Sequence, residues 1–278
     1  LDEPTATLTA HEARRLFELV DRLRQQGVAI VFVSHHLDEI FAHCQTVTVM
    51  RNGKTVFTRA IAETTSDDLI QGMVGRNLID PMLAKVSSVA TPDILLQVDR
   101  LRHSRSPHEE GVSLTLHKGE ILGIGGLIGA GRTELLRTIF GLDKAISGQV
   151  RIEGIQCSLH SPAKAIKAGL AFVTEDRKDE GLILEMPIAA NISLADMQDV
   201  STLGLLNRQR EHRLAEQKAS ELRLKFGSLN DPVATLSGGN QQKVVLAKWL
   251  ARSPSVLLLD EPTRGVDVGA KAEIYALL

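Results

Sequence analysis

One pentapeptide, Leu-Asp-Glu-Pro-Thr, occurs twice in the chain, at 1–5 and at 259–263. Before the second copy, an apolar run at 256–259 leads directly into Asp260 and Glu261. Short continuous apolar runs are typical of strands that are buried on both faces of a parallel sheet. The repeat therefore predicts an α/β architecture that occurs twice. Because the first copy starts at residue 1, without its strand, we expect the chain to be part of a longer protein.

Length and charge limit the classes of protein to consider. The 278 residues leave room for one large domain or two ordinary ones. A formal net charge of −2 argues against bulk electrostatic capture of nucleic acid. Cys44 and Cys157 lack C-x-x-C spacing, which fits a reducing cytosol. Since no apolar run reaches the ~18 residues needed to cross a bilayer, we expect a soluble cytosolic protein or one that a partner brings to a membrane.

Helix and strand patterns alternate over residues 1–80. Four apolar residues at helical spacing predict a helix that ends at Gly27: Leu16, Phe17, Val20 and Leu23. The apolar run at 28–33 is typical of a buried parallel strand. The dipeptide Asn52-Gly53 between two β-prone runs predicts a β-hairpin over 47–57. Residues 75–93 lose this periodicity and contain two prolines, which indicates a linker.

The pattern resumes near residue 94. Predicted strands cover 111–116, 120–125, 150–152, 170–173 and 256–259. Residues 132–140 are expected to be helical, and 184–252 mostly helical with an amphipathic stretch at 208–226. We therefore divide the chain into a first unit at 1–80, a linker at 81–93 and a second unit at 94–278.

A glycine-rich loop follows the predicted strand at 120–125. Residues 126–133, GLIGAGRT, match the P-loop pattern G-x-x-x-x-G-K-[ST] except that Arg132 replaces lysine. Glycines let backbone N–H groups curl around a phosphate, and the following helix points its positive end at the same anion. The residues expected to bind nucleotide are Gly126, Gly129, Ala130, Gly131, Arg132, Thr133 and Glu134.

Two details refine this interpretation. The Thr133 hydroxyl is placed to bind Mg²⁺, but the planar guanidinium of Arg132 does not fit the tight space that a lysine ammonium occupies. The dinucleotide pattern G-x-G-x-x-G does not match, because its third glycine would fall on Ile128 or Glu134. The alternative is a glycine-rich turn that serves only close packing.

The acidic pair and a second glycine motif add to the site. Asp260 stands where a carboxylate holds Mg²⁺ through water, and Glu261 where a neighbour polarises the attacking water. Taken alone, Asp-Glu-Pro-Thr would also suit a surface turn. Upstream, LSGGNQQK at 236–243 places Ser237, Gly238 and Gly239 before a predicted helix at 243–252, where free N–H groups form a second anion-binding end.

A P-loop, LSGGNQQK and LLLDEPTRGVD, in this order, resemble an ATP-binding cassette of ABC transporters. Three segments, GLIGAGRTE, TEDRK and DEPTRGVDVGAK, are similar to those of the second cassette in tandem ATP-binding subunits of bacterial sugar importers. These importers take up ribose, galactose, xylose, arabinose and related sugars. The resemblance covers essentially the whole chain. It implies a P-loop NTPase fold with a helical subdomain and two cassettes in tandem, both truncated: the end of the first at 1–80 and most of the second at 94–278.

In the family, each ATP lies between the P-loop and acidic pair of one cassette and the signature of the other. The resemblance therefore assigns Asp2 to metal, and Glu3 and the switch histidine His35 to catalysis, at a first site. The opposing wall of that site would be the signature residues Ser237, Gly238 and Gly239.

The second site departs from the family pattern. It would use Arg132, Thr133, Asp260 and Glu261, with Glu175 in place of the usual glutamine that senses Mg²⁺. An aromatic residue to stack on adenine is missing at 101–107. After the second acidic pair the expected Asp267 is kept, whereas the first copy has Leu8-Thr9 there. We expect this site to bind nucleotide and to turn it over weakly, and neither site to be complete in this chain.

The resemblance implies a subunit that uses ATP and Mg²⁺ to drive sugar import at the cytoplasmic face of the plasma membrane. Its partners would be permease subunits and, through them, a periplasmic or extracellular sugar-binding protein, with no nucleic acid. Five residues in 181–192 would meet the permease or belong to the core: Leu182, Ile183, Leu184, Met186 and Pro187. One alternative is a non-hydrolysing nucleotide-binding fragment. The other is a cassette protein of translation or DNA repair, and the net charge of −2 disfavours only this second alternative.

Overall fold

The computed structural model describes residues 1–5, 8–34, 36–51, 53–74, 90–103, 110–127, 129–157, 160–266 and 268–277. The chain divides into two compact units. One comprises Leu1–Lys85 and Gly265–Leu278, and the other Val86–Arg264. In the described part of the chain, no helix is long and apolar enough to cross a membrane.

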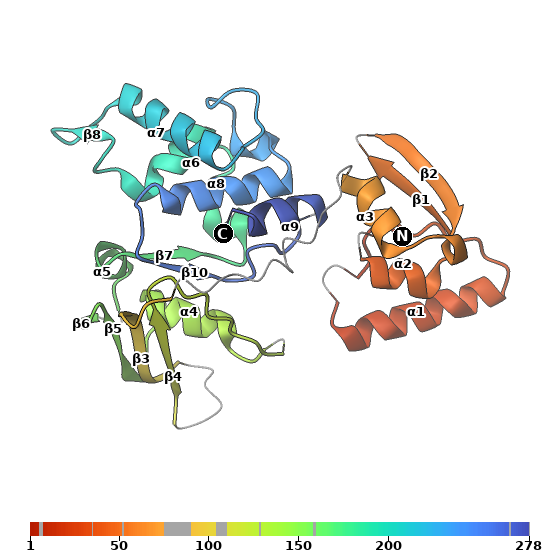
Figure 1. Cartoon of the computed structure of the whole chain (residues 1–278), viewed down its shortest axis with the longest axis horizontal. Helices are drawn as coiled ribbons and strands as arrows, with labels where there is room; N and C mark the ends of the chain where they lie inside the picture. The colour runs from red at the N-terminus through yellow and green to blue at the C-terminus, as the bar shows by residue number, and fades with distance from the viewer. Residues whose placement is uncertain are drawn as a thin grey trace. The chain divides into compact units, whose positions relative to one another are not determined.

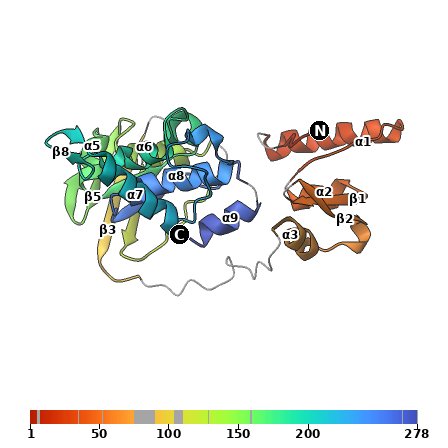
Figure 2. The ribbon, with the colours of Figure 1, turned by 90° about the horizontal axis from the view of Figure 1, so that it is seen from above.

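The first unit contains a β-hairpin with α3 packed against it, together with further helices. Its elements are α1 (Ala10–Gln25), α2 (Leu37–His43), β1 (Thr46–Arg51), β2 (Lys54–Ala60), η1 (Ile61–Glu63), α3 (Ser66–Val74) and α9 (Val268–Tyr275). In Figure 2, α2 and the hairpin lie between α1 and α3. The core is formed by Ile40, Val47, Val49 and Leu69. The predicted helix that ends at Gly27 and the predicted hairpin are both confirmed, although Asn52 of the turn lies outside the described residues.

The predicted buried strand at 28–33 is wrong. Val28, Val31 and Val33 are 46%, 81% and 51% exposed. The segment does pair in parallel with residues 1–3: Val33 N donates to Leu1 O at 2.8 Å, and Glu3 N donates to Val33 O at 2.8 Å. This ladder is too short to form a regular strand, and no described strand pairs along the other edge. The apolar side chains therefore stay exposed.

The second unit is built in layers (Figure 1). An antiparallel sheet has the order β4-β3-β5-β6, and a parallel pair joins β7 to β10. The strands are β3 (Ile94–Arg102), β4 (Val112–His117), β5 (Ser147–Ile152), β6 (Ile155–Cys157), β7 (Leu170–Val173) and β10 (Val256–Leu259), with a small hairpin of β8 (Ser201–Thr202) and β9 (Leu205–Leu206). The helices are α4 (Arg132–Phe140), α5 (Pro162–Lys167), α6 (Ile188–Ser193), α7 (Arg208–Glu221) and α8 (Gly238–Leu250).

One side of the parallel pair contacts α4, and α8 also packs on β7. A single apolar core joins the antiparallel sheet, α4, β7 and β10, with Val150, Ile139 and Phe172 nearly inaccessible to solvent. On the other side, α6 and α7 pack on α8 as a helical layer. The predicted strands at 111–116, 150–152, 170–173 and 256–259 and the helix at 132–140 are confirmed, as is the mostly helical region.

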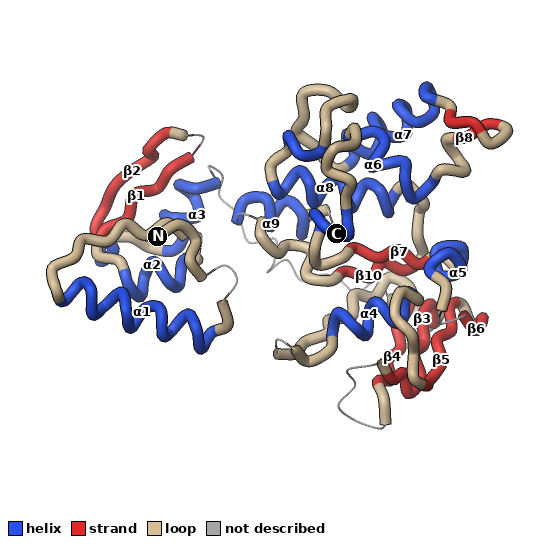
Figure 3. Tube along the Cα trace, turned by 180° about the vertical axis from the view of Figure 1, so that it is seen from behind, coloured by secondary structure: helices blue, strands red, loops and turns tan. Residues whose placement is uncertain are grey.

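The predicted strand at 120–125 is not formed. The segment between β4 and α4 is irregular (Figure 3), and Ile121, Leu122 and Ile124 are 73%, 40% and 39% exposed. In the described residues β7 and β10 pair only with each other, so the segment has no ladder to complete its backbone hydrogen bonds. The predicted linker at 81–93 lies outside the described residues up to residue 89.

A buried asparagine fixes the loop between β7 and α6. Asn191 is fully buried, its Oδ1 accepts from Ile183 N at 2.8 Å, and its Nδ2 donates to Ile183 O, Met186 O and Pro187 O at 3.0–3.2 Å. One side chain therefore contacts four backbone groups of the loop, which also pairs with the segment at 229–234 through an antiparallel bridge between Pro187 and Pro232.

We expect Asn191→Ala to lower the free energy of unfolding by about 2 kcal/mol, because it removes the side-chain hydrogen bonds of a buried residue and leaves Ile183 N without its acceptor. Urea denaturation followed by the fluorescence of Trp249, the only tryptophan of the chain, measures this loss. Asn230→Ala at an exposed position is the matched control and should change stability by less than about 0.5 kcal/mol. Equal stability of the two variants would contradict the bracing role of Asn191.

Candidate functional site

The glycine-rich loop leads into α4 in a conformation that suits an anion. Gly129 and Gly131 have φ values of +82° and +85°, the left-handed region that favours glycine. Gly131 is also the N-cap of α4, so no side chain occupies the first N–H groups of the helix. These groups and the helix dipole form an anion-binding end. Ile128, the centre of the loop, lies outside the described residues.

Asp260 is a buried carboxylate at the end of β10. Its backbone N donates to Val173 O at 3.0 Å, which continues the ladder with β7, and the residue is only 4% exposed. Its Oδ2 is buried and accepts no hydrogen bond from the described residues. Burial raises the pKa of Asp260, and the nearby Glu261 charge adds to this, while Thr133 and Arg132 oppose it. A buried oxygen of this kind suits a cation that is bound with the nucleotide.

Glu175 follows β7 and reaches the start of α4. The Thr133 hydroxyl donates to Glu175 Oε2 at 3.3 Å, and Arg264 forms an ion pair with the same carboxylate. Thr133, Glu175 and Asp260 thus meet where β7 and β10 end and α4 begins. These three residues could hold Mg²⁺, which takes few protein ligands and completes its shell with phosphates and water. Among the described residues, no group of three or more His, Cys, Asp and Glu could hold a metal ion by itself.

Arg132 and Glu261 contact each other directly. Arg132 Nη2 lies 3.0 Å from Glu261 Oε1, and both side chains are partly exposed. Glu261 has a φ of +41°, and Glu3 in the first pentapeptide has a φ of +39°. A left-handed backbone is uncommon for residues other than glycine and is found at functional sites. The two copies of the pentapeptide therefore share a specific backbone shape as well as a sequence.

The signature residues open α8. Ser237 is the N-cap, and the helix starts at Gly238 instead of at the predicted residue 243. The boundary prediction is wrong because Gly238 and Gly239 adopt helical geometry, which leaves their N–H groups in the unsatisfied first turn. The Asn240 Nδ2 donates to Ser237 Oγ at 3.0 Å and fixes that hydroxyl.

The residues expected at a first site lie mainly in the first unit. Asp2 pairs in parallel with Val33, and Glu3 follows it. His35 and Asp267 lie outside the described residues. Sequence patterns missed Glu39, whose Oε2 accepts from Thr5 Oγ1 at 3.0 Å and from Ser34 Oγ at 2.9 Å. Arg177 and Arg264 were missed in the second unit, although both stand within motifs, TEDRK and DEPTR, that the sequence singles out.

A cavity of about 310 Å³ lies beside the helical layer. It is lined by aromatic and charged side chains that include Arg137, Phe140, Phe172, Glu180, Lys248 and Trp249. Lys248 Nζ donates to Gly181 O at 2.5 Å, and burial lowers its pKa to about 8. Arg137 Nη1 contacts Glu180 at 2.7 Å, and its Nε contacts Asp143 at 3.1 Å.

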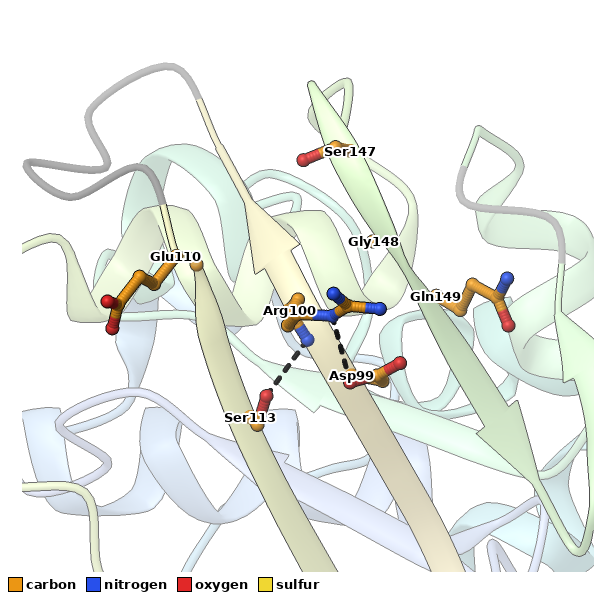
Figure 4. A pocket seen from close by; sticks show the side chains of 8 residues that line it. Asp99, Arg100, Glu110, Ser113, Ser147, Gly148 and Gln149 are labelled. Carbon is orange, nitrogen blue, oxygen red and sulfur yellow. Dashed lines mark hydrogen bonds and ion pairs between the residues drawn. The ribbon is translucent and has the colours of Figure 1, made fainter.

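A larger hollow of about 720 Å³ lies against the antiparallel sheet (Figure 4). Arg100 bulges out of β3 with a φ of +43°, and a Cβ on Gly111 would lie 2.6 Å from its carbonyl. Its polar groups pair locally: Arg100 N donates to Ser113 Oγ at 2.9 Å, and Arg100 Nε lies 3.6 Å from Asp99. None of the residues predicted to bind nucleotide lines this hollow.

Comparisons with known proteins show the family to which the chain belongs. A family model described as ABC transporter matches residues 110–264. Over its full length the chain is 45% identical to the ribose import ATP-binding protein RbsA of Oceanobacillus iheyensis and to that of Bacillus subtilis, and 48% identical to that of Streptococcus agalactiae serotype III. The chain spans 55–56% of the length of these curated relatives.

Solved structures share the fold. A dimeric ATP-binding cassette in a post-hydrolysis state with ADP and Pi is 24% identical, with a TM-score of 0.55 over 66% of this chain and 81% of that one. The cassette cbiO1 from Clostridium perfringens, part of the transporter complex cbiONQ, is 25% identical, with a TM-score of 0.53 over 66% of this chain and 72% of that one.

We expect Asp260→Asn to stabilise the ligand-free chain by about 1 kcal/mol at neutral pH, because it removes a buried charge. The raised pKa means that the folded state holds the proton more tightly, so the difference from the unchanged chain should vanish as pH falls below the ordinary value of 3.8. The variant should also lose the stabilisation by ATP that depends on Mg²⁺.

Thermal unfolding with and without ATP and Mg²⁺, as a function of pH, measures both effects. Glu216→Gln, at an exposed position of α7, is the control and should change neither. A ligand-free Asp260→Asn chain that is less stable than the unchanged one would show that the carboxylate is satisfied by partners within the fold.

Proposed function

Because the chain belongs to the ABC transporter family of ATP-binding proteins, we propose that it is an ATP-hydrolysing subunit that drives import of a monosaccharide or related small sugar through a membrane permease. The observation that carries the proposal is the meeting of Thr133, Glu175 and Asp260 at the start of α4. The similarity to proteins named as ribose import ATP-binding proteins supports the substrate class and makes ribose the first sugar to test.

The residues divide the work of phosphoryl transfer. The loop amides and the α4 N-terminus would bind the phosphates, while the Thr133 hydroxyl and the carboxylates of Asp260 and Glu175 would hold Mg²⁺. Mg²⁺, when bound, neutralises charge on the β- and γ-phosphates. Glu261 would orient and polarise the attacking water, but here it pairs with Arg132. Turnover at this site is therefore slow, since Glu261 must leave the guanidinium before it can accept a proton.

We further propose a tandem arrangement, with residues 1–80 as the end of a first cassette, 81–93 as a linker and 94–278 as the second cassette. Each acidic pair follows a segment that pairs in parallel, Leu1 with residues 31–33 and β10 with β7. The matching left-handed backbone of Glu3 and Glu261 supports the same equivalence. In this arrangement Asp2, Glu3 and His35 serve a first ATP, whose other wall is Ser237, Gly238 and Gly239.

Residues 181–192 are the proposed docking place for the permease at the cytoplasmic face of the membrane. Leu182 and Ile188 are buried and belong to the core, whereas Ile183 is 48% exposed on a loop that Asn191 holds in place. The cavity that borders Gly181 offers an aromatic-lined recess beside this loop. A braced loop next to a recess suits an apolar helix end, and the permease would in turn receive sugar from an extracytoplasmic binding protein.

We expect Ser237→Arg to stop ATP-driven sugar uptake in the transporter assembled with its permease, because the added side chain fills the wall of the first site. Uptake of radiolabelled ribose into proteoliposomes measures it. The control is Ser220→Arg at an exposed position of α7, which should leave uptake unchanged. Normal uptake by Ser237→Arg would rule out the shared site, and absence of uptake of any pentose or hexose by the unchanged protein would rule out the function.

A second substitution addresses the altered P-loop. Arg132→Lys should tighten binding of ATP with Mg²⁺ about tenfold, because an ammonium fits the loop and the change releases Glu261 from its ion pair. Calorimetric titration of the purified chain measures the affinity, and Arg151→Lys on β5 is the control. An affinity that is unchanged or weaker would show that the guanidinium does not obstruct the loop.

A further inference from the structure

A continuous series of polar contacts runs from the phosphate loop toward the signature turn. It begins with the Thr133 hydroxyl, which donates to Glu175 Oε2 at 3.3 Å. The other oxygen of that carboxylate forms the ion pair with the guanidinium of Arg264. The backbone oxygen of the same Arg264 accepts from Arg177 Nη1 at 2.8 Å. Arg177 therefore holds the segment that follows the acidic pair.

The second half of the series reaches the signature. Arg177 Nε donates to Gln241 Oε1 at 3.4 Å, across from the loop after β7 to helix α8. Gln241 is 6% exposed, and its Nε2 donates to Leu236 O at 3.2 Å, directly before Ser237. Gln241 N also donates to Ser237 O at 2.9 Å as the first helical hydrogen bond of α8. One glutamine thus fixes both sides of the signature turn.

The backbone at Arg177 belongs to a capped helical turn. Arg177 starts the helical turn η2 (Arg177–Gly181), which Asp176 caps by accepting from Lys178 N at 2.9 Å and Asp179 N at 3.1 Å. The Arg177 side chain is partly buried, and this burial lowers the pKa of its guanidinium. The bond to Gln241 is partly buried, whereas the bond to Arg264 O is exposed to solvent. Both have a charged donor, which strengthens a hydrogen bond.

We propose that Arg177 is a positioning residue that couples nucleotide binding at the second site to the conformation of the signature turn at 236–239. The proposal rests on the function proposed above, because it needs Mg²⁺ and nucleotide at Thr133 and Glu175. Thr133 and Glu175 would hold Mg²⁺ when it is bound, and the Glu175 carboxylate would then be shared between the metal and Arg264. In that case Arg264 and the two Arg177 bonds would readjust, and Gln241 would transmit the change to Leu236 and Ser237.

The consequence concerns the division of labour between the two sites. In the tandem arrangement, the signature turn serves the ATP of the first site, whereas Glu175 senses the second. Occupancy of a slow second site would then set the state of the wall that the first site needs. Coupling of this kind is reciprocal, so nucleotide at the first site would also change affinity at the second.

Hydrogen exchange of the purified chain tests this with a non-hydrolysable ATP analogue and Mg²⁺. Peptides over 126–134 report binding at the loop, and peptides over 237–243 report the signature turn. In the unchanged chain, nucleotide with Mg²⁺ should alter exchange of the signature amides about fivefold or more. In Arg177→Gln this response should fall below about twofold while the loop remains protected.

Two further variants and one further ligand condition distinguish coupling from a general loss of stability in Arg177→Gln. Arg252→Gln is the matched control, because Arg252 also crosslinks two segments, bonding Ala195 O at 3.2 Å and Asp196 Oδ1 at 3.0 Å, but lies off the series. It should keep the full response. Arg177→Lys can keep one of the two bonds and should restore part of the response. The analogue without Mg²⁺ should protect the loop and leave the signature unchanged.

The outcomes distinguish the two proposals. An unchanged chain whose loop gains no protection would overturn both the nucleotide site and the coupling. A protected loop with no change in the signature amides would overturn the coupling alone. The coupling would be equally wrong if Arg177→Gln and the unchanged chain gave the same signature response.

Discussion

The parallel pairing of β7 with β10 is the constraint on which the rest of the second unit depends. The register matches Val173 with Leu259, so the residues that follow each strand leave the sheet at the same level. Glu175 and Asp260 are carried to the same edge, beside the start of α4. A slip of one residue would shift one carboxylate by roughly 3.3 Å and turn it to the other face. The geometry of the site is therefore set by the core and not by the loops.

The site itself is assembled from interactions that oppose one another. Asp260 carries a charge that burial disfavours, and Arg132 forms an ion pair with Glu261 beside the proposed phosphate loop. Apolar burial in the layers on either side offsets these unfavourable terms, and Val150, Ile188 and Val244 are completely buried there. A nucleotide with its metal would satisfy both the orphaned carboxylate oxygen and the guanidinium. The site thus offers a carboxylate to the metal ion and a guanidinium to the phosphates of a nucleotide.

Sequence patterns predicted the elements that locate the site but not all of their pairings. The strands at 170–173 and 256–259 and the helix at 132–140 were predictable because burial on both faces and helical periodicity are local signals. The runs at 28–33 and 120–125 give the same local signal, yet they remain exposed because a parallel strand needs partners distant in sequence. The contacts of Arg177 and Arg264 have no periodicity, so only the fold reveals them.

The left-handed backbone of Glu261 and Glu3 bears on how this chain tolerates genetic change. A non-glycine residue there costs roughly 1 kcal/mol relative to glycine, which adopts such angles freely. Substitution of either residue by glycine would therefore not be selected against if folding stability were the only property under selection. The chain keeps a carboxylate in both copies against this preference of the backbone. Stability measurements by themselves would rank these two positions as improvable, and an engineer who followed them would remove the two carboxylates that we propose for catalysis.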